Sequence, residues 1–314
     1  MPKLGPKPSA MDFPDRACLT GKVYFCKVKK KYLAMRKSFL LFLLLLGKAC
    51  LFAQDTVVFT VMTFNMRYAD AVESKPEYQW EARRDAVAEM LNEEHPDILC
   101  TQEGLIRQIR FLEENLTDYQ RIGVGREDGK EQGEHSAIFI DTNRYALLDT
   151  GNFWLSQTPE TPSLGWDAHC IRVATWVRLS DKRAQKEIFV INTHLDHAGE
   201  KARENSVHLL VERIRAMVPE GTPFILTGDM NANPEDPLFQ TFGEAGFSLA
   251  KDCVPDADDG NTYNAFSYDY PRSVIDHQYF KLLKVNAYRR VTKDYGIPYL
   301  SDHFAVSCLY EWVK

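Results

Sequence analysis

The sequence predicts an α/β protein in which helices pack outside mixed β-sheets. Apolar runs of strand length recur along much of the 314-residue chain, and alternation of apolar and polar side chains with a period of two is common in it. Other stretches have the periodicity of amphipathic helices instead. Because these strands and helices interleave only in part, a purely parallel, doubly wound sheet is not expected.

Eight apolar runs are expected to be strands: residues 57–64, 98–102, 136–140, 173–179, 188–193, 224–227, 274–280 and 304–310. Three stretches are expected to be helices: residues 80–93, 106–116 and 199–218. In the first of these helices, Ala82, Ala86 and Met90 fall on one side. No linker rich in Gly and Ser, charge block or repeat divides residues 54–314, so we expect them to form a single domain.

Composition and charge narrow the classes of function. Hydrophobic residues make up 45% and charged residues 26%, which excludes a disordered, collagen-like or disulfide-dense chain. Residues 1–53 hold 11 of the 38 Lys and Arg but 2 of the 44 Asp and Glu. The remainder has 27 basic and 42 acidic residues, a net charge of −15. Such a body repels a long polyanion unless metal ions or a local basic patch intervene, but it does not exclude a small phosphorylated substrate.

A segment near the N-terminus is typical of a secretory signal peptide. After Met35, basic residues precede the apolar run at residues 39–46, and Ala53 offers a small residue for cleavage. The run is too short for a membrane-spanning helix, which needs about 20 apolar residues. We therefore expect residues 35–53 to be a signal peptide.

Export to the periplasm or the extracellular space follows from that assignment, without stable membrane insertion after cleavage. Residues 1–34 are expected to be a non-native or unstructured extension, with Met35 as the initiator. A lipid anchor on Cys50 and an uncleaved anchor are the alternatives.

Four cysteines follow the expected signal peptide: Cys100, Cys170, Cys253 and Cys308. In an exported protein they could form up to two disulfides, with three connectivities if both form. Cys100 and Cys308 lie in apolar runs and are interpreted as buried small residues. Since no CxxC motif is present, a thiolate metal site is not expected.

Polar side chains follow several of the expected strands at the point where each strand ends. Such side chains can meet above a sheet from distant parts of the chain. Carboxylate and amide oxygens suit Mg²⁺ or Mn²⁺, and a His paired with a carboxylate can act as a base. The residues in these positions are Asn65, Gln102-Glu103, Asn192-Thr193-His194, Asp229 with Asn231, Asp276-His277 and Asp302-His303.

Each of these signals also has an ordinary structural explanation. Asn65, Asp229 and Asn231 are typical turn formers. Glu103 could be a surface carboxylate, and His194 could be a hydrogen-bonded core residue. Taken singly, none of them decides a function.

Taken in order, the series resembles the endonuclease/exonuclease/phosphatase superfamily. The resemblance is collinear from near residue 57 to the C-terminus, and the stretches at residues 80–84, 133–139 and 153–156 are similar to an exported bacterial branch. It implies a four-layer α/β sandwich, in which two mixed β-sheets pack face to face with helices outside, as in deoxyribonuclease I. It specifies the substrate only weakly.

The resemblance also implies a metal site. Glu103 would be the principal ligand, with Asn65 beside it and Asp302 completing the site. The expected cofactor is Mg²⁺ or Mn²⁺.

For catalysis, the resemblance implies that Asp229 aligns the attacking water and that Asn231 steadies this arrangement. His194 would donate to a non-bridging phosphate oxygen. His303 would contact phosphate or water, with Asp276 orienting its ring. Whether Asp229 or His303 is the formal base is left open.

Three further residues are candidates for substrate binding. Arg172 resembles a family position that approaches the substrate phosphate, although a surface or salt-bridged Arg is the alternative. Glu134 would orient His194. Trp166 lies, with Trp154 nearby, in or near a proline-containing loop, where a Trp could stack on a sugar or base or could pack at the rim.

The sequence therefore predicts an exported, divalent-metal-dependent phosphoesterase that hydrolyses a P–O bond by in-line attack of water. The acidic charge favours a small phosphorylated metabolite such as a sugar phosphate. The alternatives are a secreted endo- or exonuclease acting on DNA or RNA, a phospholipid head-group diesterase, and a catalytically inactive binding module on the same scaffold. The sequence indicates no protein partner.

Overall fold

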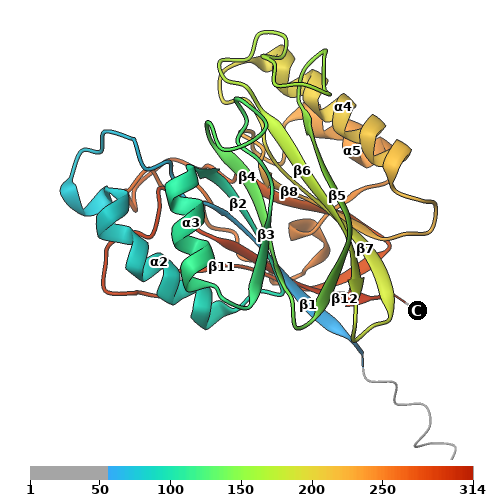
Figure 1. Ribbon diagram of the computed structural model, residues 1–314, viewed down its shortest axis with the longest axis horizontal. Coiled ribbons are helices and arrows are strands. Elements are labelled where there is room, and N and C mark those ends of the chain that lie inside the picture. Colours follow the sequence, from blue (N-terminus) through green and yellow to red (C-terminus); the bar gives the residue numbers. More distant parts are fainter. Residues whose placement is uncertain (1–55, 314) are drawn as a thin grey trace, which may run out of the picture. The chain divides into compact units, whose positions relative to one another are not determined.

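The computed structural model describes residues 56–313, in which two six-stranded sheets lie between helices (Figure 1). The predictions for residues 1–34 and 35–53 fall outside the described residues and stay predictions. Within residues 56–313, none of the helices is long and apolar enough to span a membrane.

The first sheet has the strand order β11-β12-β1-β2-β4-β3. Only β1 and β2 run parallel, with Asn65 in register with Gln102, and the other pairs are antiparallel. The strands are β1 (Val58–Asn65), β2 (Ile98–Gly104), β3 (Tyr119–Ile122), β4 (His135–Asp141), β11 (Leu283–Arg290) and β12 (Val306–Trp312).

The second sheet has the order β5-β6-β7-β8-β10-β9, and it too contains one parallel pair, β7 with β8. The strands are β5 (Tyr145–Trp154), β6 (Val173–Asp181), β7 (Lys186–His194), β8 (Phe224–Asp229), β9 (Ser248–Leu249) and β10 (Asp276–Lys281). The strands β3, β5, β9 and β11 were not expected, because they are short or carry exposed and polar residues that weaken the apolar signal.

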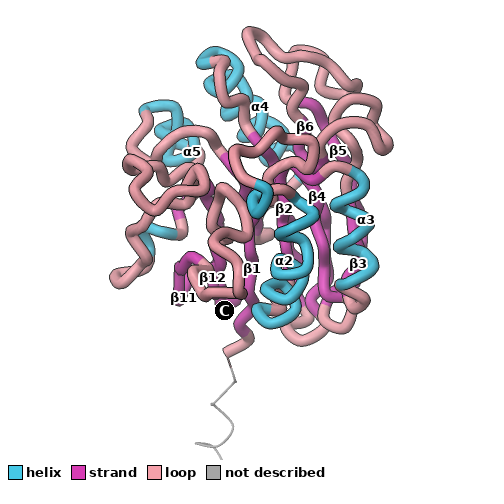
Figure 2. The backbone as a smooth tube through the Cα atoms, turned by 90° about the vertical axis from the view of Figure 1, so that its left-hand side faces the viewer, coloured by secondary structure: helices cyan, strands magenta, loops and turns pink. Residues whose placement is uncertain are grey.

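Helices cover the outer face of each sheet, so the expected four-layer sandwich is confirmed (Figures 1 and 2). The first sheet carries α2 (Trp80–Glu94) and α3 (Ile106–Asn115), and the second carries α4 (Glu200–Met217) and α5 (Gln240–Glu244). Three short 3₁₀ turns lie at Pro76–Tyr78, Pro237–Phe239 and Lys251–Cys253.

Three apolar layers hold this arrangement together. Between the sheets, side chains such as Val61, Val190 and Ile225 are fully buried. Separate clusters lie under α2 and α3, around Leu91, and under α4 and α5, around Leu210. Because each sheet is apolar on both faces, most of its central strands read as continuous apolar runs, which made them recognisable in the sequence.

The four cysteines in the described residues are free. Cys100 and Cys308 are buried in the layer between the sheets, as expected. Cys170 is partly buried, and Cys253 is exposed.

One buried side-chain pair joins the two sheets near their polar ends. Gln102 on β2 donates its Nε2 to Oδ1 of Asn192 on β7 at 2.7 Å. Asn192 donates in turn to the backbone carbonyls of Thr101 and Ala137 in the first sheet, at 2.9 and 2.8 Å. Since buried amides are costly when unpaired, these bonds favour one alignment of the sheets over others.

A second set of buried hydrogen bonds between the sheets involves Gln278. Gln278 on β10 donates its Nε2 to the carbonyls of Val61 and Val306, at 3.1 and 3.2 Å, and accepts from the Tyr310 hydroxyl at 3.1 Å. The two sheets are therefore held in position relative to each other by directional hydrogen bonds as well as by apolar packing.

Gly228 allows the ends of β7 and β8 to approach closely. It pairs with Thr193, adopts a φ of +142°, and would place a Cβ 1.8 Å from the carbonyl oxygen of Thr193. No other residue fits there without moving the backbone. The next pair in the register is His194 with Asp229, so Gly228 sets the separation of these two side chains.

We predict that Gly228→Ala lowers the free energy of unfolding by about 3 kcal/mol or more, because the added methyl group collides with the backbone of β7. Urea denaturation followed by circular dichroism measures this. Gly243→Ala is the matched control, since a Cβ at that helical position meets no atom within 4 Å and should change the stability by about 1 kcal/mol or less. Equal stabilities of the two variants would contradict the role given to Gly228.

Candidate active site

The carboxyl ends of the two parallel strand pairs meet at one edge of the sandwich. Asn65 ends β1 and donates its Nδ2 to Oδ2 of Asp229, which ends β8, at 3.0 Å. Antiparallel β10 begins beside them, with Asp276 in register with Asp229. Residues more than 160 positions apart in the sequence thus become neighbours.

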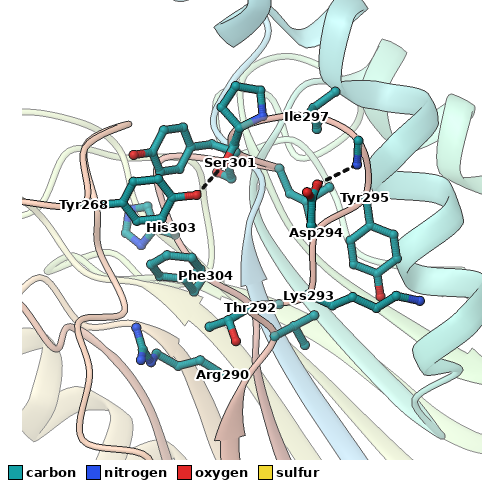
Figure 3. Close-up of a pocket in the computed structure, with 16 residues that line it drawn as sticks. Tyr268, Arg290, Thr292, Lys293, Asp294, Tyr295, Ile297, Ser301, His303 and Phe304 are labelled. Carbon is teal, nitrogen blue, oxygen red and sulfur yellow. Dashed lines mark hydrogen bonds between the residues drawn. The ribbon is translucent and has the colours of Figure 1, made fainter.

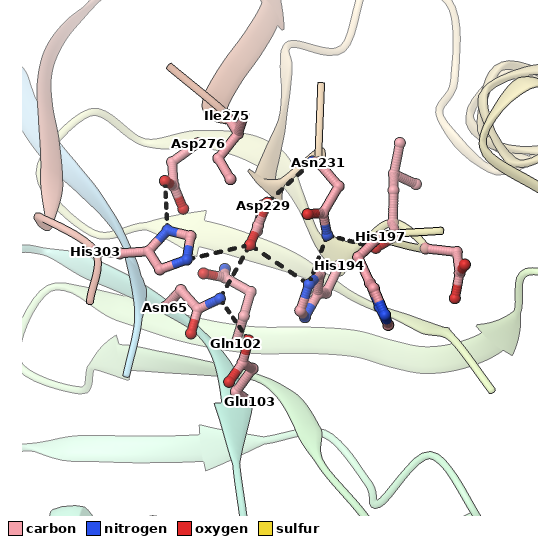
Figure 4. A network of polar contacts seen from close by, with 12 residues as sticks. Asn65, Gln102, Glu103, His194, His197, Asp229, Asn231, Ile275, Asp276 and His303 are labelled. Atoms are coloured by element: carbon pink, nitrogen blue, oxygen red, sulfur yellow. Dashed lines mark hydrogen bonds and ion pairs between the residues drawn. The ribbon is translucent and has the colours of Figure 1, made fainter. Parts of the chain in front are cut away.

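Asp229 is the centre of the polar cluster (Figure 4). It is 2% exposed, and its carboxylate accepts from Asn65 Nδ2 and from the backbone N–H of Asn231 at 2.9 Å. Nε2 of His194 lies 3.4 Å from Asp229 Oδ2, and Nε2 of His303 lies 3.7 Å from the same oxygen. Burial, followed by the charge of Asp276, raises the pKa of Asp229 above its usual range.

His303 and Asp276 form a buried pair, with 2.8 Å between Nδ1 and Oδ2. Burial by itself lowers the pKa of His303, but Asp276, Asp229 and Asp302 outweigh it and raise this pKa to about 10. Nδ1 is therefore held by Asp276, and Nε2 is turned toward Asp229 (Figure 4).

His194 has a different environment from that of His303. Burial and the nearby Arg172 hold its pKa well below the usual range, so the ring is neutral at pH 7. Its Nε2 lies 2.9 Å from Nδ2 of Asn231, which also donates to the carbonyl of Leu195 at 3.0 Å. Its Nδ1 is buried and has no protein partner in the described part of the chain. The cluster thus combines one protonated and one neutral imidazole.

Glu103 lies beside this cluster at the end of β2. Its Oε1 accepts from Asn65 Nδ2 at 3.0 Å, and its Oε2 accepts from the backbone N–H of Tyr68 at 3.0 Å. Its φ of 63° is the left-handed conformation, which is uncommon for a residue with a side chain and occurs often at functional sites.

Asp302, the third expected ligand, borders the same cleft as Glu103 and is 4% exposed. Its Oδ1 accepts from the Ser301 hydroxyl at 3.2 Å, and Nη1 of Arg67 lies 3.6 Å from its Oδ2. Asn65, by contrast, faces Glu103 with its amide nitrogen, while its Oδ1 accepts from the backbone N–H of Arg67 at 3.0 Å. Asn65 therefore orients Glu103 in this structure. Its side-chain oxygen is bonded to the backbone of Arg67 and is not offered to a cation.

The donor atoms fit a hard divalent cation. Ligand atoms of Glu103, His194 and Asp229 lie within 4.8 Å of one another, and the carboxylates of Glu103 and Asp302 line one cleft. Oxygen ligands of this kind suit Mg²⁺ or Mn²⁺. Cys170, Asp196 and His197 form another group with close ligand atoms, but the Asp196 oxygens are already occupied by backbone N–H donors.

The cluster forms the floor of a cleft of about 610 Å³. Arg172, one of the expected substrate-binding residues, lines this cleft and is 4% exposed. Its Nε lies 3.5 Å from Asp196 Oδ2, and its Nη2 lies 3.1 Å from Nδ1 of His197. Although burial opposes it, hydrogen bonding by backbone N–H groups keeps the pKa of Asp196 well below its usual range, so Asp196 is a fixed anion that positions Arg172.

Glu134 also lines the cleft, but within residues 56–313 it forms no hydrogen bond with His194. It accepts instead from Nη1 of Arg126 at 2.6 Å. A permanently charged guanidinium is a stronger partner for a carboxylate than a neutral imidazole. Burial and the charge of Glu103 raise the pKa of Glu134.

The two Trp residues considered for substrate stacking lie outside the cleft wall. Trp154 is 6% exposed and donates its Nε1 to the carbonyl of Arg126 at 2.7 Å, which is the rim packing that was the alternative. Trp166 is partly buried and is absent from the residues that line the cleft.

Several lining residues were not anticipated from the sequence: Arg67, Tyr68, Arg126, His169, Cys170 and Tyr263. Arg67 and Tyr68 follow Asn65 closely, and Cys170 lies two residues before Arg172, so proximity to expected site residues was the available signal for these three. The others lie in loops without periodicity, where only the fold brings them to the site.

A second cavity of about 650 Å³ adjoins the cleft at His303, which lines both (Figure 3). The segment from Arg290 to Ala305 forms most of its wall, and Tyr268 lies against it with its hydroxyl donating to the carbonyl of Pro298 at 3.1 Å. It contains none of the carboxylates of the cluster around Asp229.

Comparison with known proteins agrees with this geometry. The profile of the Endonuclease/Exonuclease/phosphatase family matches residues 62–303. A structure of a protein of this family from Bacteroides thetaiotaomicron is 32% identical with a TM-score of 0.77, covering 82% of this chain and 96% of that one. A mannosyl-6-phosphatase from the same species is 33% identical with a TM-score of 0.74, covering 80% and 99%.

Among curated proteins, an uncharacterized protein of Acanthamoeba polyphaga mimivirus is 29% identical over 179 residues, which are 54% of this chain and 65% of that protein. The chain thus spans slightly less than two thirds of this relative. The family profile covers most of the described residues, and the series that it spans contains the polar cluster at the ends of the parallel strands. The chain therefore belongs to the endonuclease/exonuclease/phosphatase family.

Proposed function

We propose that this protein is a divalent-metal-dependent phosphoesterase that hydrolyses a P–O bond by in-line attack of water. The observation that carries the proposal is the buried cluster around Asp229, in which carboxylates, one protonated and one neutral imidazole face a single cleft. Phosphoryl transfer needs positioning and charge neutralisation more than covalent chemistry, and this cluster supplies both.

Each residue has a role that follows from its contacts. Asp229, held by Asn65 and Asn231, accepts a hydrogen bond from the attacking water and aligns it. His303, held as a cation by Asp276, neutralises charge on the phosphoryl oxygens. Neutral His194, whose Nε2 accepts from Asn231 and whose Nδ1 has no protein partner among residues 56–313, would donate from Nδ1 to a non-bridging oxygen.

Glu103 and Asp302 would hold the cation, with Asn65 orienting Glu103. When bound there, Mg²⁺ or Mn²⁺ neutralises the negative charge that develops on the phosphoryl and leaving-group oxygens. Arg172, positioned by Asp196, lines the same cleft and would contact the phosphate.

We further propose that the substrate is a small phosphorylated metabolite such as a sugar phosphate. A mannosyl-6-phosphatase is among the similar structures, at 33% identity. The net charge of −15 after residue 53 disfavours long contact with a polyanion. The three arginines of the cleft, Arg67, Arg126 and Arg172, are each beside a carboxylate, so they form no continuous basic surface. A secreted nuclease is the alternative.

The metal site is tested by Glu103→Gln. This change should lower Mg²⁺-dependent turnover by about 10²-fold or more, because a neutral amide replaces a charged ligand. Glu89→Gln, on the exposed face of α2, is the control and should leave the rate unchanged. Turnover is measured over a range of Mg²⁺ and Mn²⁺ concentrations. A Glu103→Gln variant with the rate and metal dependence of the wild type would rule out this ligand.

The substrate class is tested by comparing kcat/KM on hexose phosphates and on duplex DNA at two salt concentrations and the same Mg²⁺ concentration. Each DNA phosphate neutralised by the protein adds about −0.9 to the slope of log affinity against log salt. We expect better turnover of the small ester, a shallow salt dependence, and a loss of kcat/KM in Arg172→Ala. Efficient cleavage of duplex DNA with a steep slope, and without phosphomonoesterase activity, would favour the nuclease.

A further inference from the structure

A tyrosine that the proposed mechanism does not use lies at the edge of the catalytic cluster. Tyr263 lines the cleft and is partly buried. It belongs to the segment that precedes β10, and its backbone forms an isolated antiparallel bridge with His303. Tyr263 therefore belongs to a segment whose backbone pairs with that of His303.

The backbone on both sides of Tyr263 is fixed by hydrogen bonds. Phe304 donates its N–H to the carbonyl of Thr262 at 2.7 Å, and Asn264 donates to the carbonyl of Asp302 at 2.7 Å. Tyr263 itself donates its N–H to the carbonyl of Ser273 at 3.2 Å. Its position relative to Asp302 and His303 is thus set by the main chain.

The ring of Tyr263 packs on the imidazole of His303, with 4.8 Å between ring centroids and an angle of 56°. The ring of Tyr270 also contacts the Tyr263 ring, with 4.9 Å between centroids and an angle of 82°. These two contacts restrict the position of the ring. The hydroxyl is the part of this side chain that can form a hydrogen bond.

The hydroxyl has no hydrogen-bond partner among residues 56–313. Burial and the charge of Asp302 raise the pKa of Tyr263 to about 12, so the hydroxyl stays protonated at pH 7 and can donate. The neighbouring cation, Arg67, is already engaged by Glu73 at 2.8 Å and Asp302 at 3.6 Å. A donor without a partner, in a cleft that accepts phosphate esters, is suited to bind the ester itself.

We propose that Tyr263 contacts the substrate, and that its hydroxyl donates a hydrogen bond to a non-bridging oxygen of the phosphoryl group bound beside His303. This inference rests on the proposed function. We assign this contact to the phosphoryl group because the ring of Tyr263 packs on His303. His303 is the residue proposed to neutralise charge on that group. Tyr263 would recognise the phosphate of any ester that enters the cleft, whatever its leaving group.

The test is Tyr263→Phe, which keeps the ring against His303 and removes only the hydroxyl. Tyr270→Phe is the matched control, because its hydroxyl lies outside the residues that line the cleft. Both variants are assayed with Mg²⁺ on a hexose 6-phosphate and on p-nitrophenyl phosphate. Inorganic phosphate is measured as a competitive inhibitor and by calorimetry.

We expect Tyr263→Phe to lower kcat/KM by about 10- to 100-fold on both substrates and to weaken the binding of inorganic phosphate, while melting at the wild-type temperature. Tyr270→Phe should behave as the wild type does. Unchanged kinetics and phosphate affinity in Tyr263→Phe would overturn the proposal. A loss confined to the sugar ester, with phosphate binding intact, would also overturn it, because the hydroxyl would then contact the leaving group.

The two proposals fail in different ways. A wild-type protein that hydrolyses no phosphate ester would refute the proposed function. The affinities of the wild type and of Tyr263→Phe for inorganic phosphate would still decide whether Tyr263 binds a phosphoryl group.

Discussion

The hydrogen bond from Asn65 to Asp229 joins the ends of two strands that belong to different sheets, and the candidate site depends on it. Its length of 3.0 Å requires the two sheets to be aligned at their polar edge. The buried pair of Gln102 and Asn192 supplies that alignment at the level of the scaffold, and Gly228 allows β8 to lie close enough to β7. The geometry of the site therefore depends on the packing of the sandwich, and a change in sheet alignment would separate the polar groups of the site.

The same edge shows how burial assigns different chemistry to similar side chains. His303 lies among three carboxylates and keeps its proton, whereas His194 lies near Arg172 and is neutral. Asp196, with backbone N–H donors on both oxygens, stays charged, and burial makes Asp229 harder to ionise. A cation bound by Glu103 and Asp302 would offset part of the energetic cost of ionising the buried Asp229, because a cation favours ionised carboxylates around it. The fold thus prepares a polar site whose electrostatics a bound metal ion and phosphate would complete.

Much of this site could be predicted from the sequence, since Asn65, Glu103, His194 and Asp229 end apolar runs that are easy to recognise. Polar strand ends can meet at one edge of a sheet, but the metal-binding and catalytic roles of these residues were predicted from the resemblance of the ordered series to a known family. The direction of each side chain could not be predicted: Asn65 faces Glu103 with its nitrogen, and Glu134 pairs with Arg126. Arg126 and Tyr263 lie in loops whose course is set by tertiary contacts, and β5 and β11 carry too many exposed residues to appear as strands.

The central claim is that the two sheets converge to hold a divalent cation at Glu103 beside Asp229. Anomalous diffraction from crystals of the protein soaked with Mn²⁺ and inorganic phosphate locates the metal directly. The account predicts one strong anomalous peak within bonding distance of a Glu103 carboxylate oxygen, with phosphate between that peak and His303. A peak at Cys170, Asp196 and His197 in its place, or no ordered Mn²⁺ at saturating concentration, would contradict the account.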